Sequence, residues 1–423
     1  MADLSTNCGG IKSPNPFWLA SAPPTNSGLQ VQRAFGAGWG GAVWKTLGVP
    51  IQNVSSRFGA VTIRGVQGAG FNNIELITDR SLDVNFKEIA ETKRLFPEHA
   101  LVVSLMVETR EEWREIIKRS VDAGADGIEL NFGCPHGMCE RGMGSAVGQE
   151  PRVNQEITSW AVEFSKVPVL VKLTPNVHDI VPHGLAARRG GAHGVSLINT
   201  IKSIIGVDID RFVPQPRVAG ASTNGGYCGA AVKPIALHMV AALAREKEFG
   251  IPISGIGGVC NWRDAVEFML LGASSVQVCT EVMLRGYKVV EDMIDGLAEY
   301  MRTHGFERVE QMVGKAVPGF SEWGDLDLNY ETVAKIDAGT CIGCQLCVQA
   351  CHDGAHQCIH PNTNGTRVPV VDECECVGCI LCQIVCPVQG CISMVQVNNG
   401  FPPATWNEAV EQGKPLRPKK GAH

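Results

Sequence analysis

The chain has 423 residues, 44% of them hydrophobic and 19% charged, with 48 Gly and 23 Pro, a composition typical of a globular protein and not of a disordered or collagen-like one. A formal net charge of -6 argues against a surface for nucleic acid. The first residues lack the basic and apolar pattern of a signal peptide, and no apolar run approaches the ~18 residues of a membrane span. We therefore expect a cytoplasmic protein that binds neither nucleic acid nor membrane.

Apolar runs of strand length alternate with amphipathic stretches over the first 310 residues. Helical patterns, for example at 111–124 and 261–273, end in Gly or small residues where a C-cap is expected. Eight strand–helix units in roughly 250 residues predict an α/β fold, a (β/α)8 TIM barrel. A doubly wound sheet is the alternative. The eight strands are expected near residues 17–22, 41–47, 101–106, 127–132, 168–174, 194–200, 252–257 and 275–282.

A glycine-rich segment, Gly36-Ala-Gly38-Trp-Gly40-Gly41, matches the GxGxxG dinucleotide fingerprint by letter. It follows a helical segment and leads into a strand, which is the reverse of the strand–turn–helix order that aims a helix N-terminus at a pyrophosphate. We therefore reject this match and expect no NAD site in this chain.

Two lysines, Lys45 and Lys172, stand in otherwise apolar strands. Burying an ammonium group without a partner is costly, so each either pairs with a core carboxylate or faces an anionic ligand. Their positions at equivalent strand ends favour a shared anionic cofactor. Strand seven ends in the glycine-rich segment 254–259 and strand eight in Gln277-Val-Cys-Thr280, and the loops after these two strands are the usual phosphate site of such barrels. Flavin mononucleotide (FMN) meets both demands, with its phosphate on the glycines and its ring near the lysines.

The loop after strand four reads NFGCPHGMCERGMG (131–144) and contains Cys134. A cysteine after a barrel strand in a glycine-bearing loop is a candidate acid or nucleophile, and a small buried thiol is the alternative. Uncharged donors and acceptors near the ends of three segments suit a ligand with alternating N–H and C=O groups, such as an imide ring. These side chains are Asn73, Asn131, Asn199 and Thr200.

Cysteine distribution sets the C-terminal part of the chain apart. Of 17 Cys, six lie in the first 340 residues and eleven between Cys341 and Cys391. A disulfide framework would need an oxidising compartment, so metal binding is the better explanation.

The spacing C-x2-C-x2-C-x3-C occurs twice, at 341–351 and at 376–386. This is the ligand pattern of a two-cluster ferredoxin, in which the fourth Cys of each run binds the other cluster. Zinc is the alternative, although it prefers two separated Cys pairs. The first run departs from the usual pattern, because His352-Asp353 follows its last Cys where proline is common. The rule gives one cluster Cys341, Cys344, Cys347 and Cys386, and the other Cys376, Cys379, Cys382 and Cys351.

Three further cysteines, Cys358, Cys374 and Cys391, fall outside this spacing, and we interpret them as ordinary small buried residues. Residues 341–400 contain four acidic side chains and one basic, a local charge of -3. Such a surface suits electron exchange with a basic partner, and a plain solvated face is the alternative.

Segments including ASAPPTNSG, WKTLG, FNNIELI, NFGCPHGMCERGMG, VKLTPNV, GIGGV and QVCTEV occur in the order found in the dihydropyrimidine dehydrogenases, which the chain resembles over almost its whole length. The resemblance implies an oxidoreductase acting on a CH–CH bond, with an FMN barrel and two [4Fe-4S] clusters. It further implies a partner flavoprotein subunit that carries FAD and takes electrons from NADH. A dihydroorotate dehydrogenase, another ene-reductase and a non-catalytic electron-transfer protein are the alternatives.

The resemblance also implies residue roles. Cys134 would protonate C5 of uracil or thymine while reduced FMN gives hydride to C6. The pyrimidine would be bound by Asn73, Asn131, Asn199 and Thr200, with Glu75 as a further candidate. Gly133 stands where the mammalian chain has serine. FMN would be bound by Ala20, Ser21, Lys45, Thr46, Lys172, Gly229, Gly257, Gly258, Cys279 and Thr280.

Four parts of the chain are expected. Residues 1–310 form the barrel with the FMN and substrate sites, and 311–334 form a linker. Residues 335–397 form the small ferredoxin-like domain, and 398–423 a C-terminal tail.

Overall fold

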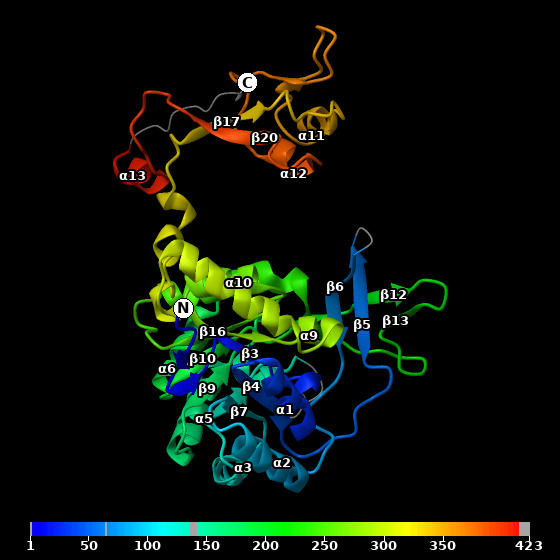
Figure 1. The fold of residues 1–423 in the computed structure, drawn as a ribbon, viewed down its shortest axis with the longest axis vertical. Helices are drawn as coiled ribbons and strands as arrows, with labels where there is room; N and C mark the ends of the chain where they lie inside the picture. Colours follow the sequence, from blue (N-terminus) through cyan, green and yellow to red (C-terminus); the bar gives the residue numbers. More distant parts are fainter. Residues whose placement is uncertain (1, 64–65, 136–141, 414–423) are drawn as a thin grey trace. The chain divides into compact units, whose positions relative to one another are not determined.

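The computed structural model describes residues 2–63, 66–135 and 142–413. The chain divides into two compact units, Met1–Gly319 and Phe320–His423 (Figure 1). Among the described residues, no helix has the length and apolarity needed to cross a membrane.

Eight parallel strands form a closed barrel at the centre of the first unit. Each barrel strand coincides with one of the eight expected runs, so the predicted TIM barrel is confirmed and the doubly wound alternative is wrong. The barrel strands are β3 (Phe17–Leu19), β4 (Gly41–Leu47), β7 (Ala100–Leu105), β8 (Gly127–Asn131), β9 (Val169–Lys172), β10 (Gly194–Leu197), β15 (Ile253–Ile256) and β16 (Ala273–Val278).

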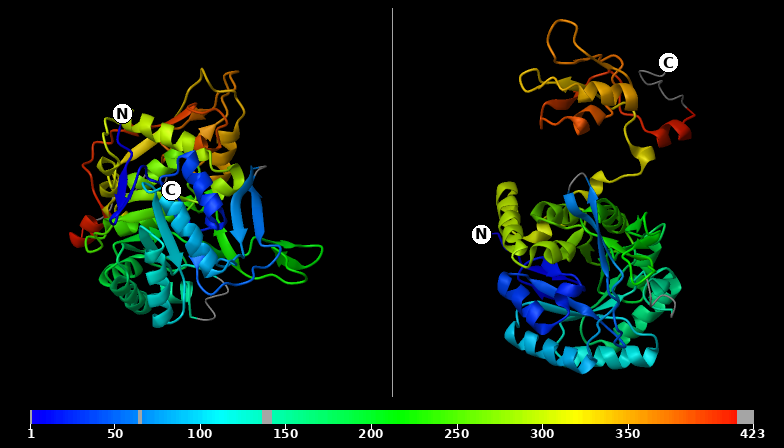
Figure 2. Two further views of the ribbon diagram at one scale, coloured as in Figure 1. Left: turned by 60° about the horizontal axis from the view of Figure 1, so that its bottom comes forward. Right: turned by 90° about the vertical axis from the view of Figure 1, so that its right-hand side faces the viewer.

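Helices surround the barrel strands, as Figure 2 shows from two sides. Their apolar residues join those of the strands in one continuous core. The short helices α4 (Ser145–Gly148) and α9 (Thr280–Arg285) follow β8 and β16. The longer helices are α1 (Gly28–Ala37), α2 (Leu82–Leu95), α3 (Arg110–Asp122), α5 (Pro151–Phe164), α6 (Val181–Arg189), α7 (Lys233–Arg245), α8 (Trp262–Leu270) and α10 (Val289–His304).

Local sequence explains where the two predicted helices begin. Thr109 caps α3 in a capping box with Glu112, and Asn261 caps α8 in the same way with Asp264. Each box satisfies N–H groups that the first helical turn leaves unpaired. Gly38 ends α1 with a φ of 112°, and β4 begins three residues later. The GxGxxG letters therefore lie in a helix-to-strand turn, as expected.

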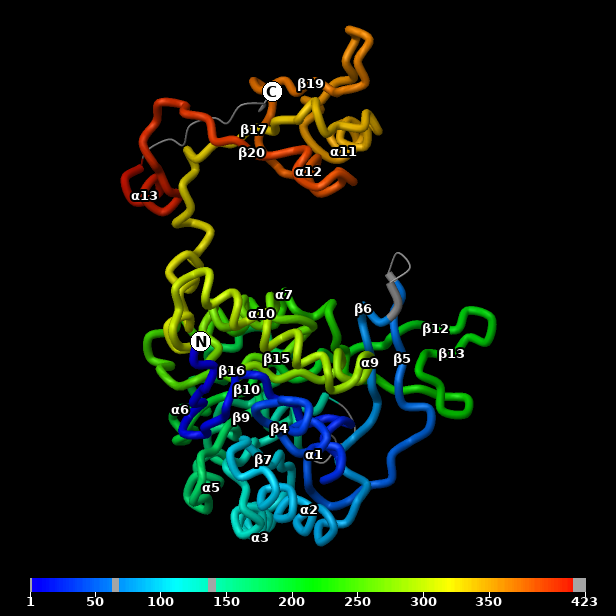
Figure 3. The backbone as a smooth tube through the Cα atoms, in the orientation of Figure 1, coloured from blue at the N-terminus to red at the C-terminus, as the bar shows by residue number. Residues whose placement is uncertain are grey.

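An antiparallel sheet that we did not expect interrupts the alternation of strands and helices. Its strands are paired in the order β11-β14-β6-β5. The β5–β6 hairpin follows β4 in the chain (Figure 3). Strands β11 and β14 follow β10. The pairing of Gly226 with Asn73 brings segments 153 residues apart into contact. The strands are β5 (Phe58–Ile63), β6 (Val66–Asn73), β11 (Ile201–Ser203) and β14 (Gly225–Cys228), with a separate hairpin of β12 (Gly206–Asp208) and β13 (Val213–Gln215).

The amino-terminal hairpin packs against one end of the barrel. Strands β1 (Thr6–Cys8) and β2 (Ile11–Ser13) pair with each other, and Cys8 and Ile11 are buried with barrel residues such as Trp18 and Val102. The carboxyl ends of the barrel strands lie at the opposite end, where barrels place their chemistry.

The second unit is a small ferredoxin-like domain. Strands β17 (Glu331–Ile336) and β20 (Ile392–Val397) form an antiparallel pair. Two helices, α11 (Leu346–Gly354) and α12 (Leu381–Val385), each begin between the second and third Cys of a run, and a second pair of strands is formed by β18 (Ile359–His360) and β19 (Val370–Val371). Gly343 and Gly378 hold equivalent places in the two runs, with φ of 66° and 68°. The repeated sequence therefore folds into the same turn twice.

Parts of the segments expected as linker and tail lie together in this unit, which begins at Phe320. β17 begins at Glu331, within the stretch 311–334 expected as a linker. Helix α13 (Trp406–Glu411) lies in the stretch expected as a tail, and its Trp406 ring is 6.1 Å from that of Trp323. The N–H of Leu328 donates to the carbonyl of Ala404 at 2.7 Å.

Candidate active site and cluster sites

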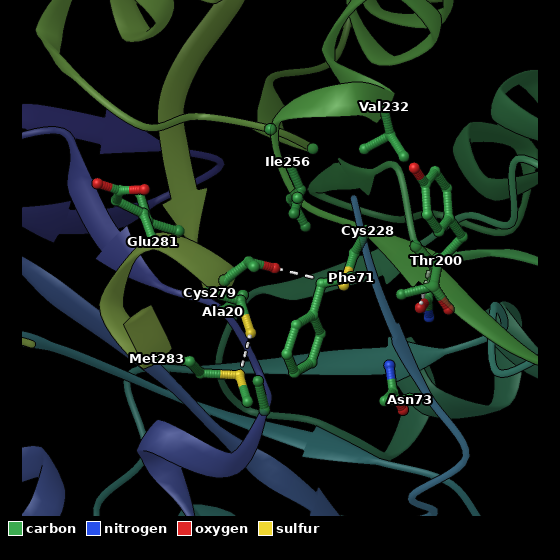
Figure 4. A pocket seen from close by; sticks show the side chains of 18 of the residues that line it. Ala20, Phe71, Asn73, Thr200, Cys228, Val232, Ile256, Cys279, Glu281 and Met283 are labelled. Atoms are coloured by element: carbon green, nitrogen blue, oxygen red, sulfur yellow. Dashed lines mark hydrogen bonds between the residues drawn. The ribbon is translucent and has the colours of Figure 1, made fainter. Parts of the chain in front are cut away.

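A cavity of about 690 Å³ opens at the carboxyl ends of the barrel strands (Figure 4). Its volume is in the range of cofactor pockets. All of the residues predicted for flavin and pyrimidine line it except Thr46. Thr46 is buried behind the wall, where its hydroxyl lies 3.1 Å from that of Ser21 and 2.9 Å from that of Ser104.

Three glycines form a narrow cradle at one part of the cavity. Gly229, Gly257 and Gly258 have φ of 90°, 126° and 77°, which other residues rarely adopt. A Cβ at Gly258 would lie 3.0 Å from the carbonyl of Gly229 and 2.8 Å from the Cβ of Lys233. The two loops therefore approach each other closely and leave backbone groups facing the cavity. This arrangement fits the phosphate of FMN.

The ammonium group of Lys45 has a carboxylate partner. Its Nζ lies 2.5 Å from Oε1 of Glu75, and Nη1 of Arg57 lies 3.1 Å from the same oxygen. Lys45 and Glu75 are almost fully buried, whereas Arg57 is one-third exposed. Lys45 therefore has a carboxylate partner, the alternative we gave, and it also lines the cavity, so its role toward an anionic cofactor stays a prediction. Arg57 is a cationic neighbour of the site that our sequence reasoning missed.

Lys172 also faces a carboxylate. Its Nζ lies 3.8 Å from Oε1 of Glu129, a fully buried side chain inside the barrel. Oε2 of Glu129 accepts a hydrogen bond from Nε2 of Gln277 at 3.1 Å, whereas Oε1 has no hydrogen-bond partner among the described residues. Glu129 and Gln277 are polar groups of the barrel interior that we did not single out, although a carboxylate within the strand GIELN was a visible signal.

Lys172→Ala is expected to lower the free energy of unfolding of the flavin-free barrel by about 3 kcal/mol, because Glu129 would keep a buried charge without its partner. Denaturant titration followed by tryptophan fluorescence measures this, since the barrel buries several Trp side chains. The double variant Lys172→Met/Glu129→Gln removes both charges and should recover most of the loss. A single-variant loss under about 1 kcal/mol would contradict the pairing.

Side-chain amides form a connected network in the cavity wall. Nδ2 of Asn131 donates to Oγ1 of Thr46 at 3.0 Å, and Nδ2 of Asn199 donates to Oδ1 of Asn131 at 3.0 Å. Oδ1 of Asn199 in turn accepts from the N–H of Thr200 at 2.8 Å. Asn73 is held from the other sheet, where its Nδ2 donates to the carbonyl of Gly226 at 3.3 Å. The structure thus brings all four predicted polar residues into one cavity.

Cys134 lies in the same wall, 9% exposed, in a small apolar cluster with Ile77, Met106 and Met143. Its carbonyl accepts a hydrogen bond from the N–H of Ser145 at 3.0 Å, so the start of α4 holds the backbone at this position. The rest of the loop, 136–141, lies outside the described residues.

Three other thiols line the cavity. Desolvation by burial raises the pKa of Cys228 to about 11 and the pKa values of Cys260 and Cys279 to about 12. Thr280 donates its hydroxyl to Sγ of Cys228 at 3.3 Å, and Sγ of Cys279 donates to Sδ of Met283 at 3.6 Å (Figure 4). These side chains are neutral thiols near pH 7 and form polarisable walls, not nucleophiles.

Cysteines gather at two cavities in the second unit. Each cavity contains one complete set of the cross-shared ligands that the spacing rule predicts. Within the described residues, no three Cys, His, Asp or Glu side chains converge closely enough for a single metal ion. A cubane spreads its four thiolates over separate corners, so the donor sets fit [4Fe-4S] clusters. One cavity is lined by Cys341, Cys344, Cys347, Cys386 and Cys391, and the other by Cys351, Cys358, Cys376, Cys379 and Cys382.

The three cysteines outside the spacing behave differently from one another. Cys358 and Cys391 are buried, as expected, but each also lines a cluster cavity. Cys374 is exposed, so our expectation of a buried residue there was wrong. It lies in a turn where its N–H donates to Oδ1 of Asp372 at 2.9 Å, and this turn directs the chain along the surface before Cys376.

Two protein families match the two units. The dihydroorotate dehydrogenase family matches residues 3–301, and the 4Fe-4S dicluster domain matches residues 334–394.

Individual relatives match the chain over most of their own length. The chain is 42% identical to the NAD-dependent dihydropyrimidine dehydrogenase subunit PreA of Escherichia coli over 93% of its own length and 96% of the relative's. It is 40% identical to the chloroplastic dihydropyrimidine dehydrogenase (NADP(+)) of Arabidopsis thaliana over 77% and 79%. It is 37% identical to the catalytic subunit of dihydroorotate dehydrogenase B (NAD(+)) of Pyrococcus horikoshii over 74% and 98%. The chain is an oxidoreductase that binds FMN and two iron–sulfur clusters, and zinc is excluded as the metal of the second unit.

Proposed function

Because the chain belongs to the dihydroorotate dehydrogenase family and carries a 4Fe-4S dicluster domain, we propose that it is the pyrimidine-reducing subunit of a dihydropyrimidine dehydrogenase. It would reduce uracil and thymine to their 5,6-dihydro forms. The observation that carries the proposal is the convergence of Cys134 with four uncharged polar side chains in one flavin-sized cavity. The two pyrimidine-enzyme relatives, each at 40% identity or above, support the same substrate class.

The amide network suits a pyrimidine ring. Uracil presents two N–H donors and two C=O acceptors around its edge, and an amide side chain can meet either kind. Asn131 and Asn199 orient each other through their hydrogen bond, so their remaining donors and acceptors are preorganised. Asn73 is the last residue of β6 and Thr200 directly precedes β11, so both reach the cavity from the antiparallel sheet. Glu75 is held nearby by Lys45 and Arg57.

Cys134 is proposed as the general acid that gives its thiol proton to C5. Bound FMN supplies the hydride for C6 and can accept electrons one at a time. The phosphate would lie on Gly229, Gly257 and Gly258, and the ring near Lys45 and Lys172, whose positive charges favour the reduced flavin. The other FMN contacts are proposed for Ala20, Ser21, Cys279 and Thr280, which line the cavity, whereas Thr46 lies behind its wall and would act by orienting Ser21 and Asn131.

The cluster ligands are proposed as the spacing rule assigned them. Cys341, Cys344, Cys347 and Cys386 would hold one cluster, and Cys376, Cys379, Cys382 and Cys351 the other. Electrons would enter from NADH through an FAD-bearing partner subunit, since the similar Escherichia coli protein is named as a subunit of an NAD-dependent enzyme. We expect this complex in the cytoplasm, where thiols stay reduced.

A comparison of turnover between three substrates tests the proposal. The anaerobic full-length chain, reduced with dithionite, is given uracil, thymine or orotate, and the dihydro products are quantified. We expect uracil and thymine to react at least ~100-fold faster than orotate, because the site would have to accommodate an additional carboxylate on C6. Faster orotate turnover would make the chain a dihydroorotate dehydrogenase. Turnover of none of the three, with flavin and iron present, would favour an electron-transfer protein.

Gly133 offers a test of the amide network. A Cβ at this position would lie 2.4 Å from Cβ and 2.5 Å from Nδ2 of Asn199. Gly133→Ser should therefore displace Asn199 and raise the KM for uracil about tenfold with flavin content unchanged. Gly36→Ser is the matched control, since a Cβ there meets no atom within 4 Å. An unchanged KM in Gly133→Ser would remove Asn199 from substrate binding.

A further inference from the structure

Each cluster cavity of the second unit is lined by five cysteines, although a [4Fe-4S] cluster takes four thiolate ligands. In the cavity assigned to Cys376, Cys379, Cys382 and Cys351, the additional thiol is Cys358, which is 4% exposed. A thiol that is buried beside a metal cluster and is not needed for its ligand count requires an explanation.

The local fold places Cys358 directly beside Cys351. After α11, the N–H groups of Ala355 and Gln357 both donate to the carbonyl of Cys351, at 3.2 and 3.1 Å. Gln357 has a φ of 59°, which reverses the chain and returns it to the helix end. The Sγ atoms of Cys351 and Cys358 consequently lie 3.6 Å apart.

Two thiols in contact can serve only one corner of a cubane. The four irons are each bound by one thiolate, and the ligands stand on separate corners. Cys351 and Cys358 therefore compete for the same iron, and a small side-chain rotation could exchange them. In the other cavity the fifth cysteine is Cys391, and its Sγ lies 3.8 Å from the carbonyl oxygen of Asp337.

We propose that Cys358 is a reserve ligand that takes the iron corner of Cys351 when the bond to Cys351 is lost. In the exchange the Fe–S bond to Cys351 breaks and that sulfur takes up a proton from water, while Cys358 releases its proton and forms the new Fe–S bond. No electron is transferred. The inference rests on the ligand assignment proposed above, and the variants below separate failure of one from failure of the other.

The test uses the full-length chain purified anaerobically, with iron and acid-labile sulfide per chain and the EPR spectrum of the reduced protein as readouts. Cys351→Ala should keep about eight iron atoms while the EPR signal of one cluster changes. Cys358→Ala should keep about eight with the signal unchanged, and the double variant should fall to about four. Flavin content reports in every case that the barrel has folded.

Two further variants serve as controls. Cys379→Ala removes a ligand of the same cluster and should lower the iron to about four, which shows that the assay detects loss of a ligand without a reserve. Cys374→Ala removes an exposed thiol and should change nothing.

Three results would overturn the proposal. Iron falling to about four in Cys351→Ala alone would mean that Cys358 cannot replace it. The same loss in Cys358→Ala alone would make Cys358 the resident ligand. Eight iron atoms in the double variant would show that neither cysteine binds the cluster, and the ligand assignment itself would then be wrong.

Discussion

Cys134→Ala is expected to retain normal flavin and iron content and to reduce uracil at least ~100-fold more slowly, the usual loss when a general acid is removed. The cavity places this thiol in a wall shared with the amide network, so its loss should remove the proton donor without removing a substrate contact. The rate is measured with dithionite as reductant, which bypasses the electron path from NADH. The effect should appear in kcat more than in KM, because the proton is transferred in the chemical step.

Two comparisons make this result interpretable. Cys134→Ser keeps the shape and a weaker acid, and it should retain a trace of activity above the alanine variant. Cys374→Ala replaces an exposed cysteine of the second unit, and this variant should reduce uracil at the rate of the unmodified chain. Turnover by Cys134→Ala within about twofold of the unmodified chain would remove Cys134 from the mechanism.

The sequence predicts the barrel well because its eight parallel strands are buried and mostly apolar, as in GAVWKTL and ALVVSL. The antiparallel sheet escaped this reasoning since β6 and β14 are rich in glycine and polar residues, and their pairing joins segments that are remote in sequence. Its strands form only because each completes the other's hydrogen bonding. Asn73 could therefore be selected from its motif, whereas the neighbour that holds it, Gly226, could not.

The partners of the buried charges could not be predicted from the sequence either. Lys45 and Lys172 stand out in apolar strands, but their partners are remote in sequence: Glu75 follows β6, 30 positions from Lys45, and Glu129 lies in β8, 43 positions from Lys172. No local pattern links a lysine to a carboxylate across a barrel. Cys358 is a third example, because the seven-residue step from Cys351 matches no ligand spacing and acquires meaning only through the turn after α11.

The isolated 423-residue chain is expected not to use NADH to reduce uracil, and a partner protein is expected to supply this activity. The only GxGxxG letters that we identified lie between α1 and β4, in a helix-to-strand turn that cannot present a helix N-terminus to a pyrophosphate. The purified chain should therefore oxidise NADH at less than about 1% of the rate at which it uses dithionite to reduce uracil. Anaerobic absorbance at the NADH band, with product quantified in the same samples, measures both rates.

Adding an NADH-oxidising FAD protein that docks on this chain should couple NADH oxidation to uracil reduction in equal amounts. A cluster-ligand variant tests the route, because Cys379→Ala should suppress the coupled reaction while leaving dithionite-driven turnover at the flavin. If docking uses the acidic surface of residues 341–400, the coupled rate should fall modestly as salt is raised and the uncoupled rate should not. Robust NADH-driven uracil reduction by the chain alone would contradict the division of labour between two subunits, and would require a nucleotide site in the barrel that our reading of its glycine turns excluded.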